Sequence, residues 1–215
     1  MLTGDKIETA INIGYSCGLL SNEMTQYVIN SVEPTEIKAS LVEMQRQKEQ
    51  ELVGKGGRKE ALVIAGEALT KVQESVDLKA AFLSVTDWTD VVLACRVSPK
   101  QKGDIVDMIR ERFPNKMTLA VGDGANDVAM IMKAHVGVGI AGREGMQAAR
   151  SSDYAIGKFK FLKPLLFLHG REAYRRIAFL VCYNFYKNFL YVVVQYYFGF
   201  YSVFSGQTLY EPWVY

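Results

Sequence analysis

Short, unbroken apolar runs alternate along most of the chain with longer segments in which apolar residues recur every three or four positions. Runs of the first kind are typical of strands buried in a parallel sheet, and the second pattern is typical of helices. Strands are predicted over residues 26–29, 62–66, 91–94, 117–121 and 136–140. Helices are predicted over residues 5–20, 67–75, 78–83, 100–112, 128–133 and 143–150. This alternation predicts a parallel α/β sheet.

A charged segment interrupts the alternation after Pro34. Its apolar residues are dispersed among Glu, Lys, Arg and Gln over residues 35–53, which predicts a surface helix. The glycine- and lysine-rich run 54–59 follows it. This run lacks both the spacing of a phosphate-binding P-loop and a preceding strand, so we expect a solvated linker.

The pattern changes again toward the C-terminal end. Residues 177–204 are almost entirely apolar and aromatic, with Lys187 as their one charged side chain. Because about 20 mostly apolar residues cross a hydrocarbon core of roughly 30 Å, this segment predicts a transmembrane helix; the alternative is a buried helix of a large soluble protein. The lysines and arginines of residues 158–176 place the preceding end in the cytosol by the positive-inside tendency.

Composition excludes several classes of function. A net charge of +2 with 22% charged residues gives no global argument for nucleic acid binding. Cys17, Cys95 and Cys182 are far apart and the chain has two histidines, so neither a disulfide framework nor a zinc site is expected. We expect the cysteines to be packing residues in a reducing compartment. The first residues show no signal-peptide pattern.

The strongest chemical signal is the run Val-Gly-Asp-Gly-Ala-Asn-Asp at residues 121–127. It lies between a predicted strand and a predicted helix, where a glycine-bent loop would present the carboxylates of Asp123 and Asp127. Mg²⁺ prefers about six oxygen ligands and usually takes one or two carboxylates, with water and phosphate as the rest. The run therefore predicts a magnesium site; the simpler interpretation is a glycine turn in which Asp127 caps a helix.

Two further turns carry candidate phosphate-binding groups. One turn, formed by Thr3, Gly4 and Asp5, lies directly before a predicted helix. It either binds phosphate together with the first N–H groups of that helix, or it only caps the helix. The other turn follows a predicted strand and enters a helix at Pro99. Lys102 at this helix start either presents a point charge to a phosphorylated group or is an ordinary solvated lysine.

Together these three segments resemble the phosphorylation domain of P-type ATPases, a branch of the haloacid-dehalogenase fold. The resemblance narrows to the phospholipid-flippase branch through several motifs in the same order. They lie at residues 93–102, 119–128, 136–140, 144–148 and 185–188. The similarity covers nearly the whole chain and is weak only from about residue 30 to residue 59. Where related flippases often have Asp, this chain has Ala65.

The resemblance implies a role for each matching residue. Asp123 and Asp127 would hold Mg²⁺, and Lys102 would neutralise phosphate oxygens during phosphoryl transfer. Asp5 would join Lys102 and Asp123 as a catalytic residue. The residues expected to shape the phosphoryl or nucleotide pocket are Thr3, Gly4, Asp5, Arg96 and Asn126. ATP is the implied substrate and Mg²⁺ the implied cofactor.

The resemblance also implies a domain organisation. Residues 1–168 would form a partial haloacid-dehalogenase-like phosphorylation domain, with a charged insertion near residues 33–60. The following parts would be a basic juxtamembrane segment (169–176), a transmembrane helix (177–204) and a loop or the start of a further span (205–215). The family's nucleophilic aspartate, in an Asp-Lys-Thr-Gly-Thr motif, has no match here, and Asp87 is its nearest imitation. We therefore expect a fragment that alone neither autophosphorylates nor transports.

Polar residues recur at helical spacing within the predicted transmembrane segment. Asn184, Lys187 and Asn188 fall on one side of a helix with Tyr191 and Gln195. A lysine near the centre of a bilayer costs roughly 2.5–3.5 kcal/mol, so it would face protein or water, or would snorkel to the interface. We interpret the stripe as a path for a lipid headgroup. The absence of acidic residues from this segment favours phospholipid over metal cations as cargo.

The sequence thus predicts part of an ATP-driven phospholipid flippase, with a cytosolic catalytic domain and several spans in the full-length protein. By resemblance, its partners would be phospholipid, the membrane and an accessory β-subunit, with no nucleic acid. Three alternatives remain open. They are a membrane-anchored phosphatase of the same fold, a truncated regulatory module without activity, and part of a cation pump.

Overall fold

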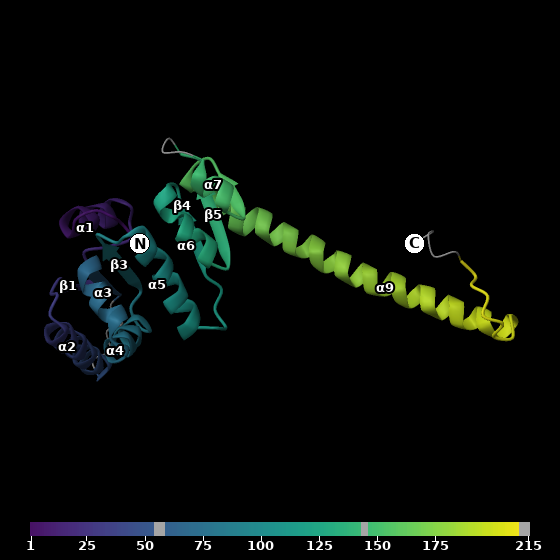
Figure 1. Cartoon of the computed structure of the whole chain (residues 1–215), viewed down its shortest axis with the longest axis horizontal. Coiled ribbons are helices and arrows are strands. Elements are labelled where there is room, and N and C mark those ends of the chain that lie inside the picture. Colours follow the sequence, from purple (N-terminus) through teal and green to yellow (C-terminus); the bar gives the residue numbers. More distant parts are fainter. Residues whose placement is uncertain (54–58, 143–145, 211–215) are drawn as a thin grey trace. The chain divides into compact units, whose positions relative to one another are not determined.

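A computed structural model describes residues 1–53, 59–142 and 146–210 of the chain (Figure 1). The chain divides into two compact units, Met1–Gly157 and Lys158–Tyr215, and each is described by itself. Several predicted features lie wholly or partly outside the described residues. They are the linker 54–59, the first residues of the helix 143–150 and of the motif 144–148, and the end of the loop 205–215.

The first unit holds two three-stranded sheets whose neighbouring strands are all parallel. The first sheet has the order β1-β2-β3, formed by Thr25–Ile29, Glu60–Ala65 and Val91–Cys95. The second has the order β4-β5-β6, formed by Leu119–Gly122, Val136–Ile140 and Tyr154–Ile156. The predicted parallel α/β architecture is confirmed, but its strands form two sheets instead of one. The sequence did not predict β6, because three residues are too few to show an apolar run.

Helices separate the strands, as the alternating pattern predicts. The first unit contains α1 (Ile7–Ser16), α2 (Pro34–Val53), α3 (Gly66–Glu74), α4 (Val76–Thr86), α5 (Pro99–Arg112), the 3-10 turn η1 (Ala125–Asp127), α6 (Val128–Lys133) and α7 (Gln147–Ser151). The helix predicted over residues 5–20 ends earlier, at Ser16. Gly18 has a φ of 72°, a left-handed conformation that turns the chain back, and the amide of Leu20 then donates to the carbonyl of Gly14.

The charged helix α2 contributes to the core, which the prediction of a surface helix missed. Ile37, Leu41 and Met44 are buried and recur at intervals of four and three residues. They form one apolar stripe in an otherwise polar helix, and the stripe joins the same core as strand β2. Ile37, Leu41 and Met44, which looked dispersed in the sequence, therefore form the core-facing side of the helix, whereas Val42 is exposed.

Strand β2 lies at the centre of the first sheet, and all six of its residues are buried. Ala61 and Val63 pack with Ala10 of α1 on one face. Leu62 and Ile64 join the core formed with α2, α3 and α4 on the other face. Successive strand residues point to opposite faces, so a strand covered on both sides must be apolar throughout.

The second sheet has a separate, smaller core. Ala120, Met130, Ile131 and Ala148 form it. Leu2 packs against this core and also against the core of the first sheet. The first residues of the chain therefore lie where the two sheets approach each other.

The three cysteines differ in their surroundings. Cys95 is buried at the end of β3, and this burial raises the pKa of its thiol. Cys17 and Cys182 are exposed, so the expectation that all three are packing residues holds for Cys95 alone.

The second unit is dominated by one long helix, α9 (Arg171–Tyr201), shown in green to yellow in Figure 1. The short helical turns η2 (Phe159–Phe161) and α8 (Leu162–Pro164) and the π-helical turn η3 (Leu165–Gly170) lead into it without a break. Across the described residues, the continuous helix Phe159–Tyr201 is long and apolar enough to cross a membrane, with a mean hydropathy of 1.5 in its most apolar window. The predicted basic segment 169–176 is thus helical.

The helix ends three residues before the predicted limit of the span at 204. Val203 and Phe204 have φ values of 51° and 54°, which are incompatible with a right-handed helix. The backbone amide of Phe204 donates to the carbonyl of Gly199, so the chain turns back onto its own last helical turn. The ring of Phe204 occupies space that a side chain at residue 199 would need.

The packing of α2 predicts opposite outcomes for two adjacent residues. Leu41→Ala should lower the free energy of unfolding by about 2–5 kcal/mol, because it leaves a cavity in the core. Val42→Ala, at a residue that is 53% exposed, should change it by less than about 0.5 kcal/mol. Urea unfolding of the chain in detergent, followed by Trp88 fluorescence in a Trp213→Phe background, measures both. Equal effects of the two substitutions would show that α2 is not packed as described.

Candidate functional site

The turn of Thr3, Gly4 and Asp5 is fastened to the carboxyl end of strand β3. The amide of Thr3 donates to the carbonyl of Ala94 (2.9 Å), and the amide of Arg96 donates to the carbonyl of Asp5 (3.0 Å). Within the turn, the hydroxyl of Thr3 donates to the Asp5 carboxylate (2.7 Å) and accepts from the Asp5 amide (3.2 Å). Because helix α1 begins at Ile7, the turn stands just before a helix, as predicted.

Arg96 adopts an unusual backbone conformation at the same sheet edge, with a φ of 53°. Its carbonyl oxygen would lie 2.3 Å from a Cβ atom at residue 66, so Gly66 is the residue type that permits this approach. Gly66 directly follows Ala65, the last residue of β2. The ends of β2 and β3 and the N-terminal turn therefore lie together, as loops at the carboxyl ends of parallel strands do.

Helix α5 begins with a complete set of local signals. The Ser98 hydroxyl accepts from the Gln101 amide and the Gln101 side chain accepts from the Ser98 amide, a capping box with Pro99 in the first turn. The Gln101 side-chain amide also donates to the carbonyl of Gly66 (3.0 Å). The helix start that carries Lys102 is thereby held against the end of β2.

Lys102 forms an ion pair with Asp127, which follows it by 25 residues. The Lys102 Nζ atom lies 2.7 Å from Asp127 Oδ1, and the two side chains are only 11% and 13% exposed. The other carboxylate oxygen of Asp127 accepts from the Asp123 amide (3.3 Å). The structure thus joins the helix start at 98–102 to the predicted magnesium-binding turn.

Gly122 makes room for this arrangement. A Cβ atom at residue 122 would lie 2.3 Å from Asp127 Cβ and 2.8 Å from Asp127 Oδ2. The Asp127 side chain therefore folds under the end of β4, where only glycine leaves space for it. Asp123 and Asn126 are exposed on the same turn.

The donor set fits a magnesium ion through one carboxylate. The Asp123 carboxylate is open to solvent, and a single carboxylate with water and phosphate oxygens is a usual arrangement for Mg²⁺. Asp127 is already bonded to Lys102 and to the Asp123 amide. No group of three or more His, Cys, Asp or Glu residues that could hold a metal occurs in the part of the chain that the structure describes. That Asp127 is a second ligand stays a prediction; Lys102 and the Asp123 amide use two of the about four acceptor sites of its carboxylate, so the ion pair need not open.

The predicted site residues fall into two groups. Thr3, Asp5 and Arg96 share one set of contacts, and Lys102 shares another with Asp127 and the Asp123 amide. Between these groups, the described residues show no direct hydrogen bond or ion pair. Helix α5, which begins beside Arg96 and carries Lys102, connects them through the backbone.

Residues that sequence reasoning missed support both groups. Gly66 and Gly122 allow close approaches, and Gln101 fastens the helix start. The capping box Ser98–Gln101 was detectable in the sequence from its spacing, whereas the need for the two glycines was not.

The polar residues predicted as a lipid path all lie on α9. Asn184, Lys187 and Asn188 are exposed at helical spacing. Gln195, one further member of the stripe, has a specific structural role instead. Its side-chain amide donates to the carbonyl of Gln207 (3.2 Å) and accepts from the amide of Leu209 (3.0 Å), which holds the segment after the helix against it.

Comparison with known proteins gives consistent similarities along the chain. A family model described as phospholipid-translocating P-type ATPase C-terminal matches residues 149–215. The chain is 46% identical over 214 residues to phospholipid-transporting ATPase DRS2 of Saccharomyces cerevisiae, an alignment that covers 99% of this chain and 16% of that protein. It is 42% identical over 236 residues to probable phospholipid-transporting ATPase IM of Homo sapiens, covering 99% of this chain and 20% of that protein. The chain therefore spans about a fifth or less of the length of these relatives.

The glycine under Asp127 gives a direct test of the site geometry. Gly122→Ala should destabilise the first unit by about 1–3 kcal/mol, because the new methyl group displaces Asp127 from Lys102. Gly157→Ala is the matched control, since nothing lies within 4 Å of a Cβ atom there, and it should change stability by less than about 0.5 kcal/mol. Urea unfolding measures both variants. A neutral Gly122→Ala would mean that Asp127 does not occupy the described position.

Proposed function

Since the chain belongs to the phospholipid-transporting P-type ATPases, we propose that it forms part of an ATP-driven pump that moves phospholipid between membrane leaflets through an aspartyl-phosphate intermediate. The observation that carries this proposal is the paired Lys102 and Asp127 beside the open carboxylate of Asp123, at the carboxyl edge of a parallel sheet. The chain also contains a helix able to cross a membrane.

Asp123 and Asp127 are the proposed magnesium ligands, Asp127 through an acceptor site that Lys102 and the Asp123 amide leave open. A bound Mg²⁺ would neutralise charge on the phosphoryl oxygens. The Asp123 carboxylate needs no rearrangement to accept it, because it is exposed on the turn.

Lys102 is proposed to stabilise the negative charge of the phosphoryl group. A lysine ammonium has three N–H donors, and the ion pair with Asp127 uses one of them. The remaining donors can bind phosphoryl oxygens while Asp127 keeps the ammonium in place. A charge held in position before the reaction stabilises the transition state without a cost of reorganisation.

The N-terminal turn is proposed to form the other wall of the phosphoryl or nucleotide pocket. Thr3, Gly4 and Asp5 stand before a helix, and Arg96 lies on the neighbouring loop. Asn126 completes the pocket from the exposed side of the magnesium-binding turn. None of these residues is proposed as the nucleophile, and the proposal includes that this polypeptide by itself neither autophosphorylates nor transports.

The cargo is proposed to follow the polar side of α9. Asn184, Lys187 and Asn188 offer donors to a phosphate-containing headgroup within residues 177–204, which contain no acidic side chain. An intramembrane lysine is expensive unless it faces water, protein or an anion, which favours a functional role. In the full-length protein we expect several spans, a cytosolic phosphorylation domain and an accessory β-subunit.

Loss of the proposed phosphoryl-site charges should abolish pumping. In the full-length protein, Asp123→Asn and Lys102→Met should each lower lipid-stimulated ATP hydrolysis by about 100-fold or more, because each removes a charge that acts on the phosphoryl group. Asp77→Asn, at an acidic residue in the first turn of α4, is the control and should leave the rate unchanged. A steady-state assay in lipid vesicles containing Mg²⁺ measures the rates. Normal activity of Asp123→Asn would contradict the proposed role of this turn.

The lipid path predicts a different kinetic signature. Lys187→Met should leave phosphorylation by ATP intact and raise the phospholipid concentration for half-maximal stimulation about 10-fold, because the headgroup loses its cationic partner. Lys187→Arg, which keeps the charge, should retain most of the stimulation. Phosphoenzyme labelling and a phospholipid titration of ATP hydrolysis separate the two steps. Unchanged lipid dependence in Lys187→Met would remove Lys187 from the path.

A further inference from the structure

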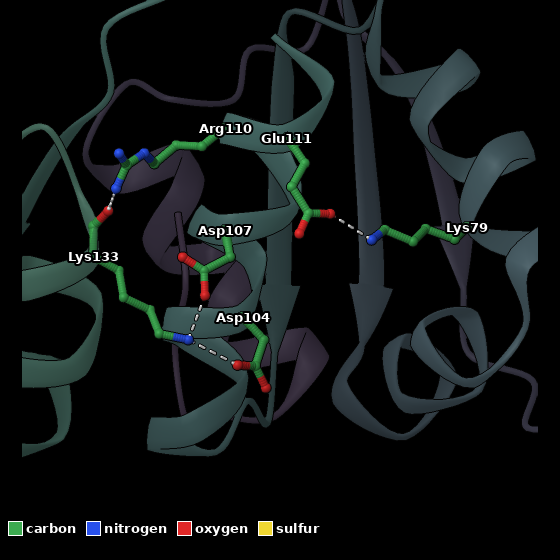
Figure 2. A network of polar contacts seen from close by, with 6 residues as sticks. All are labelled: Lys79, Asp104, Asp107, Arg110, Glu111 and Lys133. Atoms are coloured by element: carbon green, nitrogen blue, oxygen red, sulfur yellow. Dashed lines mark hydrogen bonds and ion pairs between the residues drawn. The ribbon is translucent and has the colours of Figure 1, made fainter. Parts of the chain in front are cut away.

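Lys133, the last residue of α6, is bonded to helix α5 at three points. Its Nζ atom lies 2.6 Å from Asp107 Oδ2 and 3.0 Å from Asp104 Oδ1. Its backbone carbonyl accepts a hydrogen bond from the guanidinium of Arg110. Figure 2 shows the ammonium between the two carboxylates and Arg110 reaching the carbonyl from the next turn of α5.

Gly103 gives the lysine stem its place on α5. A Cβ atom at residue 103 would lie 3.0 Å from Lys133 Cδ and 3.4 Å from its Cε and Nζ atoms. Glycine inside a helix is unfavourable relative to alanine, and here its bare surface is covered by the lysine stem. Gly103, Asp107 and Arg110 recur at intervals of four and three residues, so they share one face of α5. We call Lys133 and its four partners on α5, namely Gly103, Asp104, Asp107 and Arg110, the Lys133 clamp.

The clamp lies between the layers of the two sheets. Helix α5 packs on the first core through Ile105 and Ile109, whereas α6 contributes Met130 and Ile131 to the second core. No strand ladder joins the two sheets in the described part of the chain. The polar contacts seen there between the two layers involve two lysines, Lys102 bonded to Asp127 and Lys133 bonded to α5.

Helix α6 connects the clamp to the candidate site. It is six residues long, or roughly 9 Å at 1.5 Å per residue. Asp127 immediately precedes its first residue, and Lys133 is its last. Because Asp127 and Lys133 lie at opposite ends of this one short helix, a displacement of the Lys133 end from α5 would be transmitted to Asp127.

We propose that Lys133 is a positioning residue for the magnesium and phosphate site: seated over Gly103 between Asp104 and Asp107, it holds α6 on α5 so that Lys102 and Asp127 stay paired. The effect on phosphoryl transfer rests on the proposed function, whereas the effect on the ion pair does not. Hydrogen bonds to Asp107 and then Asp104 raise the pKa of Lys133 above its ordinary value of 10.5. A lysine whose pKa is raised in the folded state contributes its full stabilisation below the ordinary pKa. This stabilisation is lost only as the pH rises through the higher pKa of the folded state, so the clamp is closed at neutral pH.

The neighbouring ion pair on α5 provides a matched control. Lys79 of α4 lies 2.9 Å from Glu111, and its side chain is 36% exposed, the same fraction as that of Lys133. Figure 2 shows Glu111 pointing toward Lys79, while Asp104, Asp107 and Arg110 point toward Lys133. The ion pair between Lys79 and Glu111 joins α5 only to α4, a helix that packs on the first sheet. Loss of this ion pair should therefore leave the position of Asp127 unchanged.

The first experiment reads the ion pair itself. NMR spectra of the whole chain in detergent, with ¹⁵N-labelled lysine, are compared with those of the variants Lys133→Met, Lys133→Arg and Lys79→Met. The signal of the Lys102 ammonium is assigned from its loss in Lys102→Arg. Lys133→Met should shift this signal toward that of a solvent-exposed lysine and speed its hydrogen exchange by about 10-fold or more, whereas Lys133→Arg and Lys79→Met should retain the original signal. Should Lys133→Met not fold, Asp107→Asn removes one clamp bond and is read in the same way. An unchanged Lys102 signal in a folded clamp variant would overturn the proposal.

The second experiment reads the consequence in the full-length protein. Lys133→Met should raise the Mg²⁺ concentration for half-maximal phosphoenzyme formation about 10- to 100-fold, the usual range for residues that orient a metal ligand, while Lys79→Met leaves it unchanged. A shifted Lys102 signal without a change in Mg²⁺ dependence would overturn the proposed effect on the site. If Asp123→Asn is also fully active, the proposed function fails, and the shifted signal still establishes the coupling between the clamp and the ion pair.

Discussion

The buried ion pair between Lys102 and Asp127 is the interaction on which the rest of the site depends. Both side chains are nearly removed from water, so each charge is stable only beside the other, and loss of one partner of such a pair typically costs about 3–5 kcal/mol. The pair also sets the Asp123 turn, since the second carboxylate oxygen of Asp127 accepts from the Asp123 amide. One carboxylate thus holds both the cation proposed to face phosphate and the loop proposed to face magnesium.

Helix α5 makes this pairing possible because it belongs to both halves of the first unit. Its apolar residues Ile105 and Ile109 pack on the first core, Val106 packs on the second, and its polar face receives Lys133. Its start is set by the Ser98 capping box and by the bond from Gln101 to Gly66. The two sheets share no strand ladder in the described residues, so the site geometry follows from how α5 and α6 pack on each other (Figure 1).

The second unit follows a different physical rule. The most apolar window of the helix Phe159–Tyr201 has no residue buried by the rest of the chain, and its surface is rich in exposed aromatic side chains. Such a surface is stable against hydrocarbon or against other spans, where the backbone is already satisfied by the helix itself. Burying an unpaired polar side chain in those surroundings costs free energy. The Gln195 side chain avoids this because it forms hydrogen bonds with two backbone groups of the following segment.

Local pattern was sufficient for the parts of this protein that depend on local physics. The apolar run of β2 indicated a doubly covered parallel strand, the residues 177–204 indicated a spanning helix, and Pro99 indicated the start of α5. The stripe Ile37, Leu41 and Met44 was also present in the spacing, although the surrounding charges concealed it. The tertiary structure alone decided that the strands divide into two sheets and that Lys102 pairs with Asp127. It also decided that Gly122 leaves space for the side chain of Asp127 and Gly103 for that of Lys133. These features arise where segments distant in the chain approach within a few ångströms, and the repeat of a single helix or strand carries no information about which neighbour will stand there.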